Sequence, residues 1–371
     1  MLKQYKLKDY DFRLVAYVVV LTIIGILVIG SANSSVQGKQ ILGLVLGLIT
    51  MVVVSLMDYE FLLRFSWIFY FINIVLLTLV LIMGDKSKGA TRWVEIAGIR
   101  FQPSELGKIL LILFFAYFFA KYQESVNRPK VLIGSFILAG IPLALIKKEP
   151  DLSTTIVTAL IFLVLLFMAG LSYKFIATVL AVSVPSAAIF LALILQPDQK
   201  IFSGDTTYQG NRIIAFFNKE EYANTLGYQQ EYSVMAIGSG QLTGKGYKTN
   251  QISSVKNANF ISEQETDFIY AVIGEEFGFI GSSAVVILLL LISLECFAVA
   301  RKAKDTAGAV IATGIGALIG FQSFINIGVV TYLLPNTGLP LPFVSYGLTS
   351  LISSFIGIGL VLNVGLQCKQ K

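Results

Sequence analysis

Long runs of apolar residues, separated by shorter polar segments, occupy most of the chain. A run of about 17 to 25 apolar residues is long enough to cross the hydrocarbon core of a bilayer as a helix. The pattern predicts ten such helices, at residues 14–30, 41–57, 66–83, 106–120, 131–146, 154–171, 175–196, 279–300, 307–334 and 346–366. We therefore expect an all-α integral membrane protein, with residues 1–371 forming a single polytopic domain.

The composition supports a membrane protein and not a soluble one. Of the 371 residues, 56% are hydrophobic and only 13% are charged, whereas soluble domains carry about 25% charged residues. The formal net charge of +6 is expected from basic loops on the cytoplasmic side of the membrane, so we do not expect nucleic-acid binding. The first apolar run has no small-residue cleavage site after it, and we expect it to remain as a helix.

The positions of Lys and Arg predict the orientation of the helices, because cytoplasmic loops are enriched in basic residues. With the N-terminus inside, the short inner loops contain Arg64, Lys121, Arg128, Lys130, Lys174, Arg301, Lys302, Lys304, Lys369 and Lys371. Ten spans return the C-terminus to the inside. An N-in, C-in topology then places residues 197–278 outside as a large extracellular loop, which is too long to be a simple connection.

The stretch EQETDFIYAVIGEEFGFIG, residues 263–281, carries acidic residues to the predicted membrane boundary. Carboxylates are costly there unless a function requires them, which makes Asp267 the first candidate for chemistry. The competing interpretation is that Thr266 and Asp267 cap the start of a helix, which would be worth about 1 kcal/mol. Glu275 and Glu276 are expected at the outer end of the next span, paired with Arg92, Lys147 or Lys148.

Glu105 and Lys108 lie three residues apart at the start of the fourth span, on one helix face. Lys108 is a candidate for holding a catalytic carboxylate ionised or for contacting a phosphate. The alternative is a lysine that reaches the interface, together with a glutamate that complements the helix dipole.

Two further outer segments are candidates for binding. Residues 238–246, GSGQLTGKG, are rich in glycine and could hold a phosphate through backbone N–H groups around Lys245, although flexible loops have the same composition. Residues 334–347, LPNTGLPLPFVSYG, contain three prolines and two glycines. This segment cannot be helical throughout, and we expect it to line a cavity if it enters the membrane.

The chain contains no histidine, which excludes Ser-His-Asp and Cys-His catalysis and most transition-metal sites. Its two cysteines, Cys296 and Cys368, give no disulfide framework. Any chemistry must therefore use carboxylates, basic groups, hydroxyls or the backbone.

Five stretches together resemble the SEDS family (shape, elongation, division and sporulation), which includes RodA and FtsW. They are GATRWVEIAGIRFQPSELGK, EPDLSTT, YQQEYSVMAIGSGQLTGKG, EQETDFIYAVIGEEFGFIG and LLPNTGLPLPFVSYGLTS, in the family order and over nearly the whole chain. The short N-terminus and its DYDFRL entry are more similar to RodA than to FtsW. The chain departs from the usual family pattern at Glu149, Ser262, Glu265 and Leu348.

The resemblance implies a peptidoglycan glycosyltransferase that polymerises lipid II at the outer face of the bacterial cytoplasmic membrane, with inversion at the anomeric carbon. Asp267 is the expected general base, with Lys108 as its partner or as a pyrophosphate contact and Glu105 placing the lysine. The substrate-binding candidates are Arg92, Arg212, Lys245, Glu263 and Ser345. A divalent cation, Mg²⁺ or Mn²⁺, is a candidate cofactor at the pyrophosphate.

Two other functions remain open at this point. A lipid II flippase also fits ten spans with broken, proline-rich segments, but it would place its charges along a path through the membrane. A non-catalytic scaffold for a penicillin-binding protein predicts that Asp267 is dispensable. The resemblance also implies a class B penicillin-binding protein, a transpeptidase, as partner, together with the elongation or division machinery.

Overall fold

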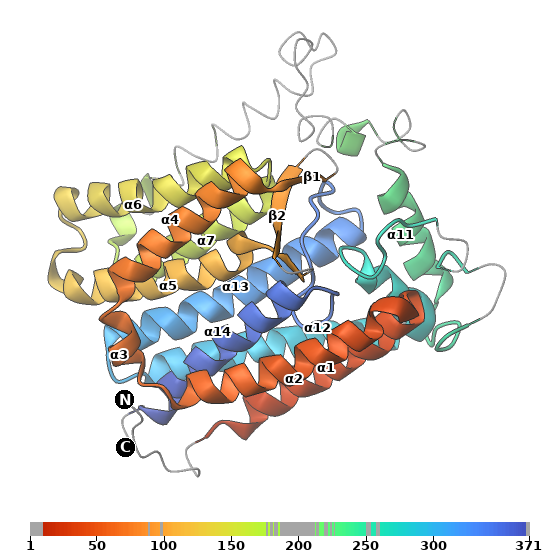
Figure 1. Cartoon of the computed structure of the whole chain (residues 1–371), viewed down its shortest axis with the longest axis horizontal. Helices are drawn as coiled ribbons and strands as arrows, with labels where there is room; N and C mark the ends of the chain where they lie inside the picture. Colours follow the sequence, from red (N-terminus) through yellow and green to blue (C-terminus); the bar gives the residue numbers. More distant parts are fainter. Residues whose placement is uncertain are drawn as a thin grey trace, which may run out of the picture.

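The computed structural model describes residues 10–87, 90–96, 99–175, 227–249, 254–256 and 260–368, and also residues 177, 178, 181, 185, 212, 215–218, 222 and 225. In this part of the chain, long helices form an elongated bundle with a small sheet near one end (Figure 1). Most of the predicted span 175–196 and most of residues 197–226 of the predicted outer loop lie outside the described residues.

Nine of the ten predicted spans coincide with helices. These are α1 (Phe12–Ala32), α2 (Ser34–Leu56), α4 (Ser66–Met83), α5 (Pro103–Lys121), α6 (Pro129–Lys148), α7 (Leu152–Met168), α12 (Ile269–Lys302), α13 (Thr306–Val330) and α14 (Leu348–Leu366). Among the described residues, eight of these helices are long and apolar enough to cross a membrane, and α7 is a shorter apolar helix. The short helices α3 (Tyr59–Leu63) and η2 (Gln123–Ser125) lie at connections, and α11 (Tyr228–Ser239) lies within the predicted outer loop.

Short polar side chains begin several of these helices. Asp11 accepts backbone N–H bonds at the start of α1, Asn33 does so for α2, and Asp305 accepts the N–H of Gly308 at 2.7 Å for α13. Such caps satisfy N–H groups that have no partner within the helix. They also show where α1, α2 and α13 must start.

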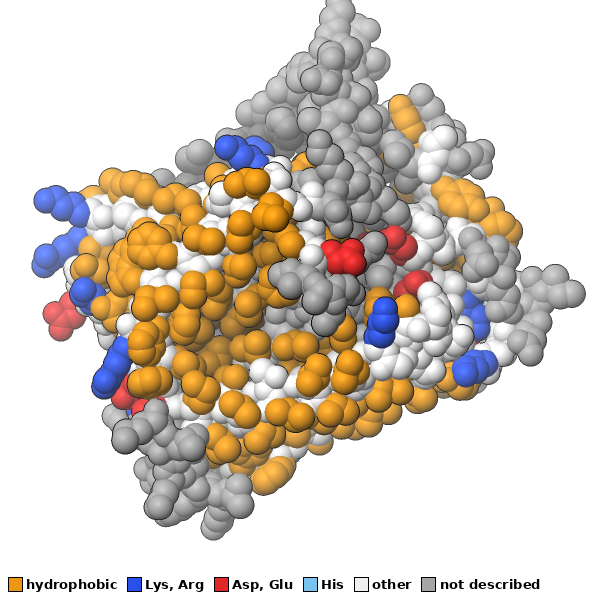
Figure 2. All heavy atoms as spheres, in the orientation of Figure 1, with side chains coloured by type: hydrophobic (Ala, Val, Ile, Leu, Met, Phe, Trp, Pro, Cys, Tyr) orange, Lys and Arg blue, Asp and Glu red, His pale blue; other side chains and the backbone are white. Residues whose placement is uncertain are grey.

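The helices divide into a central group and a peripheral group. In the most apolar stretch of α5 and of α13, 78% of the residues are buried, and in α14 the share is 72%. The share is only 28% in α2 and α4 and 22% in α6, whose outward side chains would face lipid. In Figure 2 hydrophobic side chains cover the middle of the bundle, and several Lys and Arg lie at the end where α1 begins and α14 ends. Both observations fit a multi-pass membrane protein.

A three-stranded antiparallel sheet joins α4 to α5. Its strands are β1 (Asp85–Ser87), β2 (Ala90–Ile96) and β3 (Ile99–Phe101), with Asp85 paired to Trp93 and Val94 paired to Phe101. These strands were not predicted from the sequence. Pro103 follows at the first turn of α5, a position where its missing N–H costs nothing. The sheet fixes the backbone around Arg92.

Helix α12 is broken at Gly278, whose φ of +63° and ψ of −158° are not helical. Residues 241–246 pair with the free backbone groups on both sides of the break. Before it, the carbonyls of Glu275 and Glu276 accept the N–H groups of Lys245 and Gly246; after it, Phe279 and Ile280 donate to the carbonyls of Gln241 and Leu242. Unpaired backbone groups would be costly at membrane depth, so this loop and the break form one structural unit.

The segment between α13 and α14, residues 331–347, has no regular helix or strand, as its prolines predicted. Its backbone carbonyls are therefore bound by side chains of the bundle. Gln230 of α11 donates to the carbonyl of Leu334, Ser153 of α7 donates to that of Thr337, and Gln40 of α2 donates to that of Ser345. Three helices thus fix the path of a segment whose carbonyls at these positions have no partner in a regular helix or strand.

Candidate active site

Asp267 lies one residue before the N-cap of α12. That N-cap is Phe268, and no side-chain hydrogen bond caps the helix. The capping interpretation of Asp267 is therefore wrong, because a cap requires the side-chain oxygen to accept an N–H of the first turn. The Asp267 carboxylate remains available for another role.

The surroundings of Asp267 make it a weaker acid than usual. Burial and the charge of Glu263 raise the pKa of this carboxyl and the Arg92 and Arg212 guanidinium groups lower it, which leaves the pKa at about 6. A carboxylate with a pKa near the working pH can accept a proton from a hydroxyl and release it again. This environment suits a general base.

Gly338 allows both the Asp267 carboxylate and the Arg92 guanidinium to approach the same point of the backbone. A Cβ atom at position 338 would lie 3.1 Å from Asp267 Oδ2 and 3.7 Å from Arg92 Nη1. Gly338 also has a φ of +72°, which strains any residue with a side chain. The segment 331–347 thus presents bare backbone to the two charged groups.

Residues 149–151 hold Arg92 in this place. Arg92 Nη2 donates to the carbonyl of Pro150 at 2.7 Å, and Arg92 Nε lies 3.5 Å from Asp151 Oδ2. Asp151 is buried and also accepts the N–H of Thr154, which caps α7. The sequence showed four charges crowded in KKEPDLS, but it did not reveal that this segment binds Arg92.

Arg212 and Glu263 complete the charged groups around Asp267. Arg212 Nη1 donates to the carbonyl of Asn336 at 3.3 Å, two residues from Gly338. Glu263 is exposed and has a φ of +56°. Of the predicted site residues, the structure therefore gathers Asp267, Arg92, Arg212 and Glu263 in one place.

Glu105 and Lys108 form a separate, fully internal pair. Lys108 Nζ donates to Glu105 Oε1 at 2.7 Å and to Gln322 Oε1 at 2.8 Å, and the lysine side chain is 1% exposed. It makes no ion pair with Asp267. Glu105 contacts the lysine, and both side chains are buried; a role of either residue in the reaction stays a prediction.

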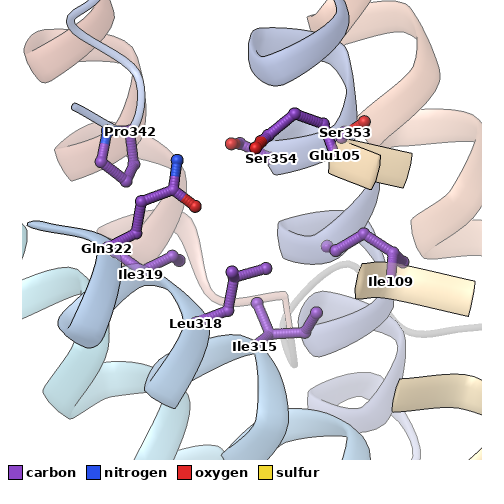
Figure 3. A pocket seen from close by; sticks show the side chains of 10 residues that line it. Glu105, Ile109, Ile315, Leu318, Ile319, Gln322, Pro342, Ser353 and Ser354 are labelled. Atoms are coloured by element: carbon purple, nitrogen blue, oxygen red, sulfur yellow. The ribbon is translucent and has the colours of Figure 1, made fainter. Parts of the chain in front are cut away.

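A small cavity lies beside the Glu105–Lys108 pair. It has a volume of about 10 Å³, and Glu105, Gln322, Pro342, Ser353 and Ser354 are among its lining residues (Figure 3). This volume and these polar groups suit a single water molecule. It is too small for a sugar.

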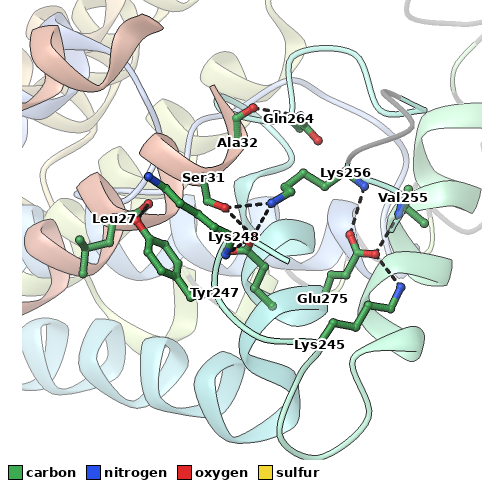
Figure 4. Close-up of polar contacts among 11 residues, drawn as sticks. Leu27, Ser31, Ala32, Lys245, Tyr247, Lys248, Val255, Lys256, Gln264 and Glu275 are labelled. Carbon is green, nitrogen blue, oxygen red and sulfur yellow. Dashed lines mark hydrogen bonds and ion pairs between the residues drawn. The ribbon is translucent and has the colours of Figure 1, made fainter. Parts of the chain in front are cut away.

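Lys245 is held by structural contacts. Its Nζ donates to Glu275 Oε1 at 2.7 Å (Figure 4), and its own backbone N–H is bound by the Glu275 carbonyl. The N–H groups of Gly244 and Gly246 also donate to carbonyls, so the predicted phosphate cradle at GSGQLTGKG is not available. Close packing explains a glycine in this loop instead, because a Cβ at Gly244 would lie 2.1 Å from the Glu276 carbonyl oxygen. A substrate contact by Lys245 stays a prediction.

Glu275 and Glu276 are buried and have partners other than the expected Arg92, Lys147 and Lys148. Glu275 binds Lys245 and also accepts the N–H groups of Val255 and Lys256. Glu276 Oε1 lies 2.6 Å from Lys256 Nζ and accepts from Ser31 of α1. The two carboxylates therefore fasten the outer loop to the bundle.

Ser345 closes the turn that faces Asp267. Its Oγ donates to the carbonyl of Thr266 at 2.6 Å and accepts the N–H of Leu341 at 2.7 Å. The first bond links the 331–347 segment to the residue before Asp267, and the second closes a turn within the segment. A substrate role for Ser345 stays a prediction, and its observed contacts position the backbone.

Three residues of the site were missed from sequence: Asp151, Gln322 and Asn326. Gln322 and Asn326 are buried in α13, where they bind the carbonyls of Pro340 and Leu339. Carboxamides within an apolar span are a signal for function or for bound backbone, and this signal was available at 307–334. Among the described residues, no three His, Cys, Asp or Glu are grouped as metal ligands.

Comparison with known proteins covers almost the entire chain. The probable peptidoglycan glycosyltransferase FtsW of Trichlorobacter lovleyi is 33% identical over 99% of this chain and 96% of its own length. The peptidoglycan glycosyltransferase MrdB of Escherichia coli K12 is also 33% identical, over 95% of this chain and 93% of its own.

Solved structures have the same fold. The rod shape determining protein RodA of Thermus thermophilus matches with a TM-score of 0.69 at 26% identity, covering 98% of both chains. A chain from a peptidoglycan synthase complex, described for the coordination of polymerization and crosslinking, matches with a TM-score of 0.77 at 27% identity, covering 96% of this chain and 97% of that one. The family model for FtsW, RodA and SpoVE, described as cell cycle proteins, matches residues 11–370. This chain is a member of the FtsW/RodA/SpoVE family, the SEDS proteins.

Proposed function

We infer that this chain is a peptidoglycan glycosyltransferase that polymerises lipid II, as the names of its relatives indicate. The observation that supports this most directly is the approach of both Asp267 and Arg92 to Gly338. Glycosyl transfer from a lipid pyrophosphate requires a base and a cation near each other. The Asp267 carboxylate and the Arg92 and Arg212 guanidinium groups, with Glu263 nearby, form the site at one end of the bundle.

The reaction assigns one role to each charged group. Asp267 accepts the proton of the 4-hydroxyl of the acceptor sugar while that oxygen attacks the anomeric carbon of the donor. The bond from the anomeric carbon to the pyrophosphate oxygen breaks on the opposite face, which inverts the configuration. Arg92 and Arg212 stabilise the negative charge that the lipid pyrophosphate gains as it leaves. The proton on Asp267 then passes to water or to the departing phosphate.

A divalent cation, in this proposal, reaches the site bound to the pyrophosphate of the substrate. The described carboxylates are not grouped as a metal site, so Mg²⁺ or Mn²⁺ would be bound by phosphate oxygens together with Asp267 or Glu263. It would neutralise phosphate charge, which Arg92 and Arg212 also do.

We further propose that the site faces the outside of the cytoplasmic membrane and that a class B penicillin-binding protein, a transpeptidase, is the partner. The basic inner loops support the orientation. The similarity to a chain from a peptidoglycan synthase complex, described for the coordination of polymerization and crosslinking, supports the partner.

The substitution Asp267→Asn tests this function. Purified protein with its partner is given lipid II, and glycan chains are separated on a gel. Loss of a general base costs about 10²- to 10⁴-fold in rate, so almost no polymer is expected at normal protein levels. The matched control is Asp305→Asn, which alters an aspartate that does cap a helix and should leave polymerisation intact.

The outcomes separate the three functions. Wild-type protein that makes no glycan from lipid II, with its partner present, contradicts the glycosyltransferase. Movement of lipid II between vesicle leaflets without glycan would favour the flippase. Full activity of Asp267→Asn would mean that Asp267 is not the base.

A further inference from the structure

We propose that Asn326 is a positioning residue for the reaction, because its side chain fixes the Asp267 backbone relative to the segment that faces it. The inference rests on the proposed function, since it concerns the placement of the general base. Asn326 lies in α13 and is 2% exposed. It does not touch the place where a substrate would bind.

One amide group of Asn326 joins the two halves of the site. Its Nδ2 donates to the carbonyl of Asp267 at 2.8 Å and to the carbonyl of Leu339 at 2.6 Å. Leu339 directly follows Gly338, which both the Asp267 carboxylate and Arg92 approach. One rigid group therefore fixes the distance between the base and the backbone beneath its carboxylate.

The chemistry of the partners determines the orientation of this amide. Both neighbours are carbonyl oxygens, which only accept hydrogen bonds, and only the NH₂ end of the side chain carries two donors. The other end, Oδ1, is buried and has no hydrogen-bond partner among the described residues. An unpaired buried acceptor is costly. The Asn326 side chain therefore bonds two backbone carbonyls although its own Oδ1 has no partner among the described residues.

Gln322 supports the same segment from one turn earlier in α13. Its Nε2 donates to the carbonyl of Pro340 at 3.0 Å, and its Oε1 accepts from Lys108. Two carboxamides four residues apart thus hold two successive carbonyls, at 339 and 340. This second contact does not reach Asp267, and Asn326 alone among the described side chains of α13 bonds to both segments.

Enzymes depend steeply on such placement, because a 1 Å displacement of a reacting group can cost about 10²-fold in rate. Without the Asn326 donors, the carbonyls of Asp267 and Leu339 would have no bond to α13 at this point. The Asp267 carboxylate would then move relative to Arg92. We expect a lower kcat, with less effect on KM, since Asn326 contacts no substrate.

The test uses the full chain with its partner and measures kcat, KM for lipid II and the pH dependence of kcat. Asn326→Leu keeps the size but removes both donors, and we expect kcat to fall by about 10²-fold with KM within about 3-fold. The acid limb of the pH profile, near the pKa of Asp267, should also move. Asn326→Ser keeps one donor, and we expect its kcat to fall by about 10-fold. This variant provides the test if Asn326→Leu does not accumulate.

Asn363→Leu is the matched control. Asn363 is also a fully buried asparagine, and it bonds the carbonyl of Ser55 and the N–H of Tyr59 at the opposite end of the bundle. We expect it to lower thermal stability as Asn326→Leu does, but to leave kcat and the pH profile of the folded enzyme unchanged. Wild-type kcat and pH profile in folded Asn326→Leu or Asn326→Ser would overturn the inference, whereas an inactive wild type would overturn the proposed function instead.

Discussion

Asp267 Oδ2 approaches Gly338 so closely that a methyl group at position 338 would lie 3.1 Å from it. This contact places the base directly on bare backbone and beside Arg92. The absence of a side chain at position 338 is therefore a requirement of the site.

Gly338→Ala should impair catalysis more than stability. The methyl group must displace the Asp267 carboxylate by a few tenths of an ångström, and we expect kcat to fall by about 10-fold or more. Gly170→Ala is the control, because Gly170 has a φ of +94° with no atom near its missing Cβ. Both variants carry backbone strain of about 1–3 kcal/mol, so equal activity in the two would contradict the contact with Asp267.

Lys108→Met should strongly destabilise the protein. It leaves the Glu105 carboxylate buried without its cation, which typically costs about 3–5 kcal/mol. The double variant Glu105→Gln/Lys108→Met removes both charges, and we expect it to recover most of the thermal stability and part of the polymer yield. A stable double variant that makes no glycan would instead return Lys108 to the reaction.

Glu149 should make stability depend on pH. This carboxyl is fully buried, and neither of its oxygens has a hydrogen-bond partner among the described residues. Burial raises its pKa to about 8, with a further contribution from Asp151. The folded protein therefore keeps the proton up to about pH 8, whereas the unfolded chain releases it near pH 4.5, its ordinary value.

This difference in bound protons between the folded and unfolded states determines how stability changes with pH. The contribution of Glu149 to stability is highest below pH 4.5, declines as the pH rises, and stops declining above about pH 8, where both states have lost the proton. Glu149→Gln removes this loss and should stabilise the protein at pH 7 by on the order of 2–3 kcal/mol. The pKa of Asp267 is about 6, so thermal midpoints between pH 6.5 and 9 isolate Glu149. A parallel pH dependence in both proteins would contradict the prediction.

Cysteine labelling tests the orientation. In a background without Cys296 and Cys368, Ser262→Cys should react in intact cells with a reagent that cannot cross the membrane. Glu124→Cys, in the exposed connection after α5, should react only after permeabilisation. The reverse pattern would place the site on the inside.

The helices could be predicted well from the sequence because the bilayer imposes one requirement on each span. Residues 66–83, for example, were predicted as a span and are α4. The length and hydrophobicity of the local sequence determine whether such a helix forms. The irregular backbone of residues 331–347 could also be predicted locally, because its prolines prevent a continuous helix.

The site could be predicted only in part, because its contacts join distant residues. Asp267 was identifiable as an acid at a membrane boundary, whereas Arg92 was expected to bind substrate or to pair with Glu275 or Glu276. That Arg92 binds Asp151, and that Lys108 instead binds Gln322, depends on how α5, α7 and α13 pack. Likewise, the glycines of 238–246 looked like a phosphate loop until their contacts with α12 were known.

The break at Gly278 has a consequence for the biosynthesis of the protein. The backbone groups on either side of it find their partners only in residues 241–246, which are synthesised earlier. In the proposed orientation, these residues must therefore already have been translocated when α12 enters the bilayer, because the open peptide groups would otherwise meet lipid. Residues 241–246 precede α12 in the chain, so the segment that pairs with the break is made before the helix that contains it.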